Sequence, residues 1–204
     1  LKYKAFSPIR NLPSGWGDVL NHQQQHLDDW RQHYPLAFGG IVSKISKRTG
    51  LNPFFMLSLM RAESFYDPRA RSHVGATGLM QIMPYTAIKI AQMIHDERFQ
   101  LAELPNPALN ITYSMIYMRH LLRYYRGNKI LATSAYNAGP KAVERWMRLC
   151  GDCDPDEFVD GIPFRETRNY VKRVSTYVAN YRRIYGDSNS LQYIKDLPGK
   201  PVEN

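Results

Sequence analysis

The segment RAESFYDPRARSHVGATGLMQIMP (residues 61–84) joins an acidic residue to a glycine-rich turn and to an apolar run that carries an amide. The acid, Glu63, follows the largely apolar segment 54–60. Its carboxyl is therefore expected where the end of a helix meets a cleft. In the turn, Gly75 and Gly78 lack side chains, which permits positive φ values and a close approach of the backbone to a ligand.

Two later segments accompany this one, and their sequences are SAYNAGP (residues 134–140) and IPFRETRNYV (residues 162–171). Together with the pair Glu63–Ser64 and with GLMQ (residues 78–81), they resemble the catalytic domain of soluble lytic transglycosylases. These are goose-type lysozyme-like enzymes that cleave bacterial peptidoglycan. The order and spacing of the three segments make the resemblance specific.

The resemblance covers residues 34–186 and implies an all-α, lysozyme-like catalytic domain with a substrate cleft. Residues 1–33 are expected to form an extension or linker that leads into a short helix, and residues 187–204 a tail. One departure from the family is Ser114, where relatives often carry glycine. This departure concerns how closely two helices approach each other.

Proline and glycine occur along the chain at positions typical of helix boundaries. The alternation of apolar and polar residues that is typical of strands is scarce. The expected boundaries are an N-cap and first turn at Asn52 and Pro53, helix starts at Pro84 and Pro107, and an end followed by a new start at Gly139 and Pro140. These signals predict a mostly α-helical protein.

A stripe of tyrosine and valine runs along the last long helical segment, which is expected to end at Gly186. The stripe recurs at three- and four-residue intervals and consists of Tyr170, Val174, Tyr177, Val178, Tyr181 and Tyr185. Its spacing favours core packing over a binding platform. The acidic, proline-containing stretch 151–164 is interpreted as a loop.

The composition is typical of one soluble globular domain, with 204 residues of which 44% are hydrophobic and 22% charged. The first residue, Leu1, indicates a mature form or a fragment, and the chain contains no apolar run of the roughly 18 residues that span a bilayer. A formal charge of +9 favours anionic partners, which include the peptide stems of a cell wall. A solvated basic surface explains the charge equally well, and because no recognised nucleic-acid motif occurs, nucleic acid is not expected as a partner.

The two cysteines, Cys150 and Cys153, form the sequence CGDC. A single pair without partners at metal-ligand spacing argues against zinc, whereas a short-loop disulfide and two free thiols both remain open. For His22, His26 and His33, a solvated polar surface is favoured over a metal site. No metal and no organic cofactor are implied.

A Glu can protonate a glycosidic oxygen at neutral pH only if its pKa lies well above the ordinary value of about 4.3. Burial raises the pKa of a carboxyl, and the apolar helix before Glu63, together with Phe65 and Tyr66, offers such surroundings. The alternative is an exposed carboxylate at a helix end, paired with Arg61 or Arg69. The presence of the other two segments favours catalysis by Glu63.

The resemblance also implies a set of substrate-binding residues, which are Ser72, Gln81, Met83, Tyr136, Asn137 and Glu166. Each has an ordinary structural alternative. Met83 could belong to the core, Gln81 could bind only backbone groups, and Glu166 could be a favourable acid in the first turn of the last helix.

By the same resemblance, a single Glu first protonates the β-1,4 bond between MurNAc and GlcNAc. It then acts as a base on the muramyl 6-hydroxyl, so that the glycan ends are 1,6-anhydro. The expected partners are peptidoglycan glycan strands in the bacterial envelope, periplasmic or secreted. Two alternatives stay open: a hydrolytic lysozyme of the same fold, in which Asp67 or Glu166 positions water, and a non-catalytic peptidoglycan-binding domain.

Overall fold

The computed structural model describes residues 29–186, and the chain divides into the units Leu1–Pro35 and Leu36–Asn204. In the first unit, residues 29–33 are helical, and the rings of Trp30 and Tyr34 stack with centroids 5.9 Å apart. Most of the predicted extension, including His22 and His26, lies outside the described residues, as does the predicted tail at 187–204.

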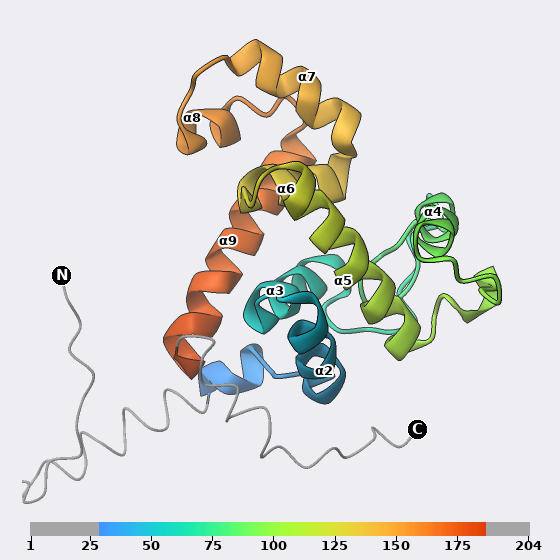
Figure 1. Cartoon of the computed structure of the whole chain (residues 1–204). Helices are drawn as coiled ribbons and strands as arrows, with labels where there is room; N and C mark the ends of the chain where they lie inside the picture. Colours follow the sequence, from blue (N-terminus) through green and yellow to red (C-terminus); the bar gives the residue numbers. More distant parts are fainter. Residues whose placement is uncertain (1–28, 187–204) are drawn as a thin grey trace, which may run out of the picture. The chain divides into compact units, whose positions relative to one another are not determined.

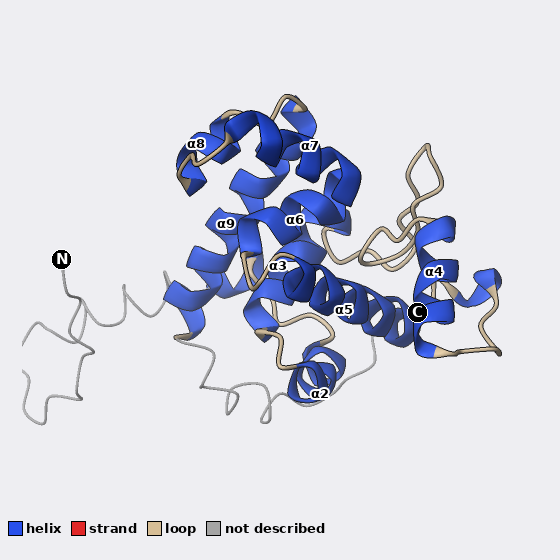
Figure 2. Ribbon diagram, turned by 45° about the horizontal axis from the view of Figure 1, so that its top comes forward, coloured by secondary structure: helices blue, strands red, loops and turns tan. Residues whose placement is uncertain are grey.

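The second unit is built from helices (Figures 1 and 2). They are α2 (Gly39–Thr49), α3 (Pro53–Ser64), α4 (Pro84–Ile94), the 3-10 helix η1 (Leu101–Glu103), α5 (Pro107–Tyr124), α6 (Lys129–Ala138), α7 (Pro140–Cys150), α8 (Pro155–Asp160) and α9 (Arg165–Tyr185). Within residues 29–186, extended pairing is limited to two isolated bridges, from Thr77 to Arg71 and to Ile82. The all-α prediction is confirmed, and the four predicted proline starts each open a helix.

Helix α3 forms the centre of this unit and packs along α9 and α2 (Figure 1). Residues 53–60 are all buried, as expected for a helix that is apolar around its whole circumference. The side-chain oxygen of Asn52 caps its start by accepting from the amides of Phe54 and Phe55. Phe65, with a φ of 54°, ends the helix in the left-handed region, so that Glu63 occupies the last turn.

The tyrosine stripe of α9 faces this core. Tyr170, Val174, Tyr181 and Tyr185 are buried, whereas Tyr177 and Val178 are partly exposed. The ring of Phe54 stacks on Tyr181 and Tyr185, with centroids 5.9 and 6.0 Å apart. The prediction of core packing is confirmed for the four buried residues.

The interpretation of residues 151–164 as a loop was wrong, because α8 lies within this stretch. Asp154 caps the helix by accepting from the amides of Asp156 and Glu157, and the Glu157 carboxylate accepts from the Asp154 amide. This capping box satisfies the free donors of the first turn. Phe158 and Val159 are buried, which gives the short helix an apolar face.

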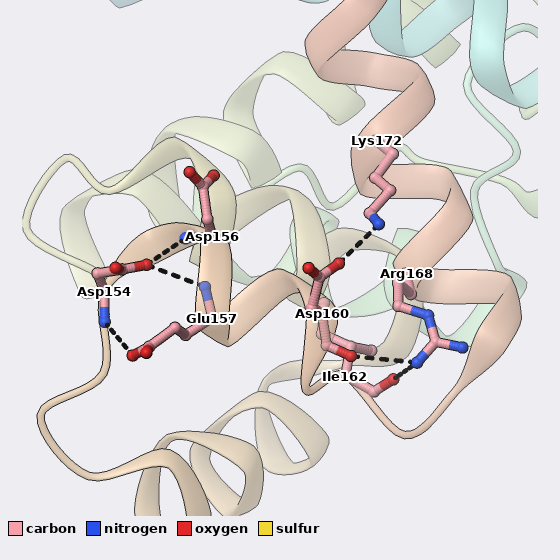
Figure 3. A network of polar contacts seen from close by, with 7 residues as sticks. All are labelled: Asp154, Asp156, Glu157, Asp160, Ile162, Arg168 and Lys172. Carbon is pink, nitrogen blue, oxygen red and sulfur yellow. Dashed lines mark hydrogen bonds and ion pairs between the residues drawn. The ribbon is translucent and has the colours of Figure 1, made fainter.

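Figure 3 shows how α8 is fixed to α9. The Arg168 guanidinium donates to the carbonyls of Asp160 and Ile162, each at 3.2 Å, and the Lys172 ammonium lies 2.7 Å from the Asp160 carboxylate. These bonds occupy one side of α9. Thr167 and Tyr170, which are buried, lie on the side that faces α6 and α3.

A disulfide joins Cys150, the last residue of α7, to Cys153, just before α8. Of the two states left open by the sequence, the structure therefore contains the disulfide. Among residues 29–186, no helix combines the length and the apolar composition needed to cross a bilayer.

Candidate active site

Glu63 sits where α3 leaves the core, and its side chain is only partly exposed. Desolvation by burial raises the pKa of its carboxyl to about 7, in spite of a hydrogen bond from Tyr170 that lowers it. The charge of Arg173 also lowers this pKa, and that of Glu166 raises it. A carboxyl with such a pKa can hold a proton near neutral pH and release it without a large cost.

The cations suggested as alternative partners of Glu63 make other contacts. The guanidinium of Arg69 lies 3.8 Å from the Asp67 carboxylate. That of Arg61 lies 4.3 Å from the ring centre of Phe65 and 5.0 Å from that of Tyr177. The Glu63 carboxyl instead accepts the hydroxyl of Tyr170 at 2.5 Å, so that a neutral donor holds its position.

The turn at residues 77–80 lies against the end of α3. The hydroxyl of Ser64 donates to the Leu79 carbonyl at 2.8 Å, and the hydroxyl of Tyr136 on α6 donates to the Met80 carbonyl at 2.9 Å. The nearby charge of Glu63 raises the pKa of Tyr136 further, beyond the effect of burial. Tyr136, one of the predicted substrate-binding residues, therefore lies close to the acid.

Four of the six predicted substrate-binding residues line one open pocket of about 260 Å³, and they are Gln81, Met83, Tyr136 and Asn137. They come from the loop after α3 and from α6. Met83 is 38% exposed and is therefore not a core residue. The structure thus brings together residues that are more than 50 positions apart in the sequence.

Gln81 has both a backbone role and a place in the pocket. Its side-chain amide nitrogen donates to the carbonyls of Ala70 and Gly78 at 3.1 and 2.9 Å. These bonds hold the residue at a φ of 45°, a conformation that non-glycine residues rarely adopt. They leave the amide oxygen as the group that can accept a hydrogen bond from a ligand.

The other two predicted residues, Ser72 and Glu166, do not line this pocket. The Ser72 hydroxyl oxygen accepts from the Ala76 amide at 2.9 Å and closes a turn in the same loop. Glu166 is exposed in the first turn of α9 and acts on Glu63 through its charge. Their contact with a substrate stays a prediction.

Asn137 ties the pocket to α9, because its side-chain oxygen accepts the hydroxyl of buried Thr167 at 2.7 Å. Thr167 and Tyr170, one turn apart, therefore fix α9 against α6 and α3. Sequence reasoning missed the role of Tyr170 at the site, since it assigned the whole stripe to the core. Its place in the segment RETRNYV, four residues after Glu166, was the available signal.

Tyr117 and Ser114 are among the residues that line this pocket without having been predicted at the site. Tyr117 packs against Tyr136 with ring centres 5.8 Å apart, and Ser114 is fully buried beside them. The Ser114 hydroxyl donates to the Asn110 carbonyl at 2.8 Å within α5, so the departure from glycine is accommodated without an unpaired group. No group of three potential metal-binding side chains occurs in the described part of the chain.

Comparison with known protein families matches the chain to two family models. The model of the transglycosylase SLT domain matches residues 40–159, and that of the soluble lytic transglycosylase helical domain matches residues 161–189. The chain belongs to the family of the transglycosylase SLT domain.

Among individual relatives, the chain is 36% identical over 167 residues to a soluble lytic murein transglycosylase of Salmonella typhimurium. It is 35% identical over 166 residues to that of Escherichia coli K12. Each alignment covers 80% of this chain and 26% of the relative. The chain therefore spans about a quarter of the length of these curated relatives.

Solved structures agree with these matches. The 70 kDa soluble lytic transglycosylase of Escherichia coli superposes with a TM-score of 0.74 at 33% identity, covering 86% of this chain and 28% of that one. A lytic transglycosylase of Pseudomonas aeruginosa superposes with a TM-score of 0.71 at 32% identity, covering 81% of this chain and 27% of that one. The lysozyme-like helical fold implied by the sequence is confirmed.

Proposed function

We propose that this chain is a peptidoglycan lytic transglycosylase that cleaves the β-1,4 bond between MurNAc and GlcNAc and leaves 1,6-anhydro-muramyl ends. The observation that carries the proposal is the Glu63 carboxyl, which is desolvated to a pKa of about 7 and oriented by Tyr170. Membership of the SLT family supports the choice of substrate and reaction. The glycan strand would lie in the pocket formed by Gln81, Met83 and Tyr136.

The chemistry uses one carboxyl group twice, first as an acid and then as a base. Protonated Glu63 donates to the glycosidic oxygen, the bond to the muramyl C1 breaks, and positive charge develops on the sugar ring. The muramyl 6-hydroxyl then attacks C1, and its proton returns to the Glu63 carboxylate. No water is consumed, and the acid is ready for another cycle. A pKa near 7 suits both halves, because the group must give and take a proton at similar cost.

The surrounding carboxylates favour this route over hydrolysis. A retaining hydrolase places a second carboxyl about 5 Å from the acid, and an inverting one uses it to activate water. Asp67 is bound in its own turn, where it accepts from the Arg69 amide at 2.9 Å. Glu166 is exposed on α9, and its charge raises the pKa of Glu63.

Digestion of purified sacculi followed by mass analysis of the products tests the proposal. Anhydro ends are lighter than reducing ends by one water and resist borohydride. Mainly reducing ends would contradict the transglycosylase route and point to a lysozyme. Binding without cleavage would instead indicate a non-catalytic wall-binding domain.

The matched control is Glu63→Gln, which keeps the shape of the side chain but cannot donate and recover a proton. We expect it to fold and to lose a factor of about 10² to 10⁴ or more in rate. Activity within tenfold of the parent would remove Glu63 from the catalytic role.

We also place the site of action in the cell envelope, periplasmic or secreted, because that is where the proposed substrate lies. The Cys150–Cys153 disulfide supports an oxidising compartment.

A further inference from the structure

Asn110, a residue outside the pocket, is fully buried on α5 and makes three hydrogen bonds to two loops. Its side-chain oxygen accepts from the Met80 amide at 2.9 Å. Its side-chain nitrogen donates to the carbonyls of Thr77 and Leu104 at 3.0 and 2.9 Å. Both amide hydrogens are used, so no other residue type of this size can make the same set of bonds.

The turn that Asn110 holds is the one that lies against the acid. Asn110 binds the amide of Met80, while Tyr136 binds the carbonyl of the same residue. Ser64, next to Glu63, binds the carbonyl of Leu79. The Leu79–Met80 backbone is therefore held from three helices, which are α5 through Asn110, α6 through Tyr136 and α3 through Ser64.

The Gly78 backbone lies in close contact with the Asn110 side chain. Its φ is +80°, and a Cβ added there would lie 2.5 Å from the Asn110 side-chain nitrogen. The backbone thus approaches Asn110 to a distance that only glycine permits. The same loop carries Gln81 and Met83, which line the pocket.

We infer that Asn110 is a positioning residue for the reaction, which holds the turn at residues 77–80 so that the Glu63 carboxyl stays desolvated and the pocket residues stay aligned. The expected effect on turnover rests on the proposed function, whereas the expected effect on the Glu63 pKa does not. Asn110 does not touch the reacting atoms and acts through the Leu79–Met80 backbone. Its loss should admit water to the end of α3.

The experiment compares Asn110→Ala and Asn110→Asp with the parent. Asn110→Asp keeps the shape and the acceptor for Met80 but loses both donors. We expect turnover of soluble glycan strands to fall about 10- to 100-fold, because small displacements of aligned groups carry costs of this order. The ¹³C titration of the Glu63 carboxyl should give a pKa below the parent value of about 7, because hydration favours the charged form.

Tyr113→Phe is the matched control. Tyr113 is buried on the same helix, and its hydroxyl holds a different segment through Asp96 at 2.7 Å. The control should lose thermal stability without a change in the Glu63 pKa. A folded Asn110 variant with parental turnover and a parental Glu63 pKa would overturn the inference.

Gly78→Ala supplies a second route if the Asn110 variants do not fold. It forces the same turn and the Asn110 side chain apart while residue 110 itself stays asparagine, and we expect the same fall in the Glu63 pKa. A folded Gly78→Ala protein with an unchanged pKa would also overturn the inference. Because the titration needs no activity, this result is distinct from failure of the proposed function, which would appear as absence of cleavage by the parent.

Discussion

The hydroxyl of Tyr170 donates a hydrogen bond to a carboxyl oxygen of Glu63 at 2.5 Å and so joins two residues that are 107 positions apart in the sequence. One lies in the last turn of α3, and the other lies within α9. The bond favours the charged form of Glu63, whereas burial favours the neutral form. The pKa of about 7 is the balance of these opposing effects, and it can be shifted from either side.

Tyr170→Phe should raise the pKa of Glu63 above its parental value. The ring keeps the site buried, while the donor that stabilises the carboxylate is lost. A hydrogen bond to a charged group is typically worth enough to change a pKa by about one pH unit. Titration of the Glu63 carboxyl by ¹³C NMR measures the change. Tyr124→Phe, which removes an exposed bond to Glu144, is the control, and a fall in the Glu63 pKa would contradict the prediction.

Glu63→Gln should stabilise the fold at high pH. The pKa of Glu63 is raised from 4.5 to about 7 in the folded state, so the unfolded chain releases its proton first. Stability of the parent should therefore fall as pH rises from about 4.5 to 7. The variant should gain about 1–3 kcal/mol in free energy of unfolding at pH 8 and little at pH 4.

Urea unfolding at the two pH values provides the measurement. Glu97→Gln, at an exposed site, controls for the loss of one negative charge. A difference between Glu63→Gln and the parent that does not depend on pH would show that the carboxyl is not desolvated.

Glu166→Gln and Arg173→Gln should shift the pKa of Glu63 in opposite directions. Removal of the negative charge of Glu166 should lower it, and removal of the positive charge of Arg173 should raise it. Both side chains are exposed, so the shifts should shrink as salt rises. The same ¹³C titration at two salt concentrations tests this, with Lys172→Gln as the control because Lys172 pairs with Asp160. Shifts of equal sign would contradict it.

The double variant Cys150→Ser and Cys153→Ser should lower stability and leave turnover unchanged. The disulfide closes a very short loop between α7 and α8, for which loop-closure entropy predicts about 1–2 kcal/mol. Neither cysteine lines the pocket beside Tyr136. Thermal unfolding and sacculus digestion measure the two effects. Lost activity in a folded double variant would connect this disulfide to the site.

The sequence could predict the helices because their signals are local. Asn52, Pro84 and Pro107 act on the adjacent turn, so their residue types alone placed the helix starts. The helix α8 was missed although Asp154 and Glu157 formed a complete capping box, because the acidic composition of the stretch was given more weight than its capping pattern.

The sequence by itself also singled out Glu63 and four of the residues that line the pocket, since these lie in short segments whose order and spacing are specific to a family. Only the tertiary structure decided that Tyr170, buried with the stripe, also donates to the acid, that Asn137 binds Thr167, and that Asn110 holds the turn beside Glu63. These contacts join residues 30 to 107 positions apart. They depend on how helices pack side by side, and the periodicity of each helix alone does not determine this packing. The pKa of Glu63 is likewise determined only by the tertiary structure, because desolvation depends on the residues packed around the carboxyl and not on the residue itself.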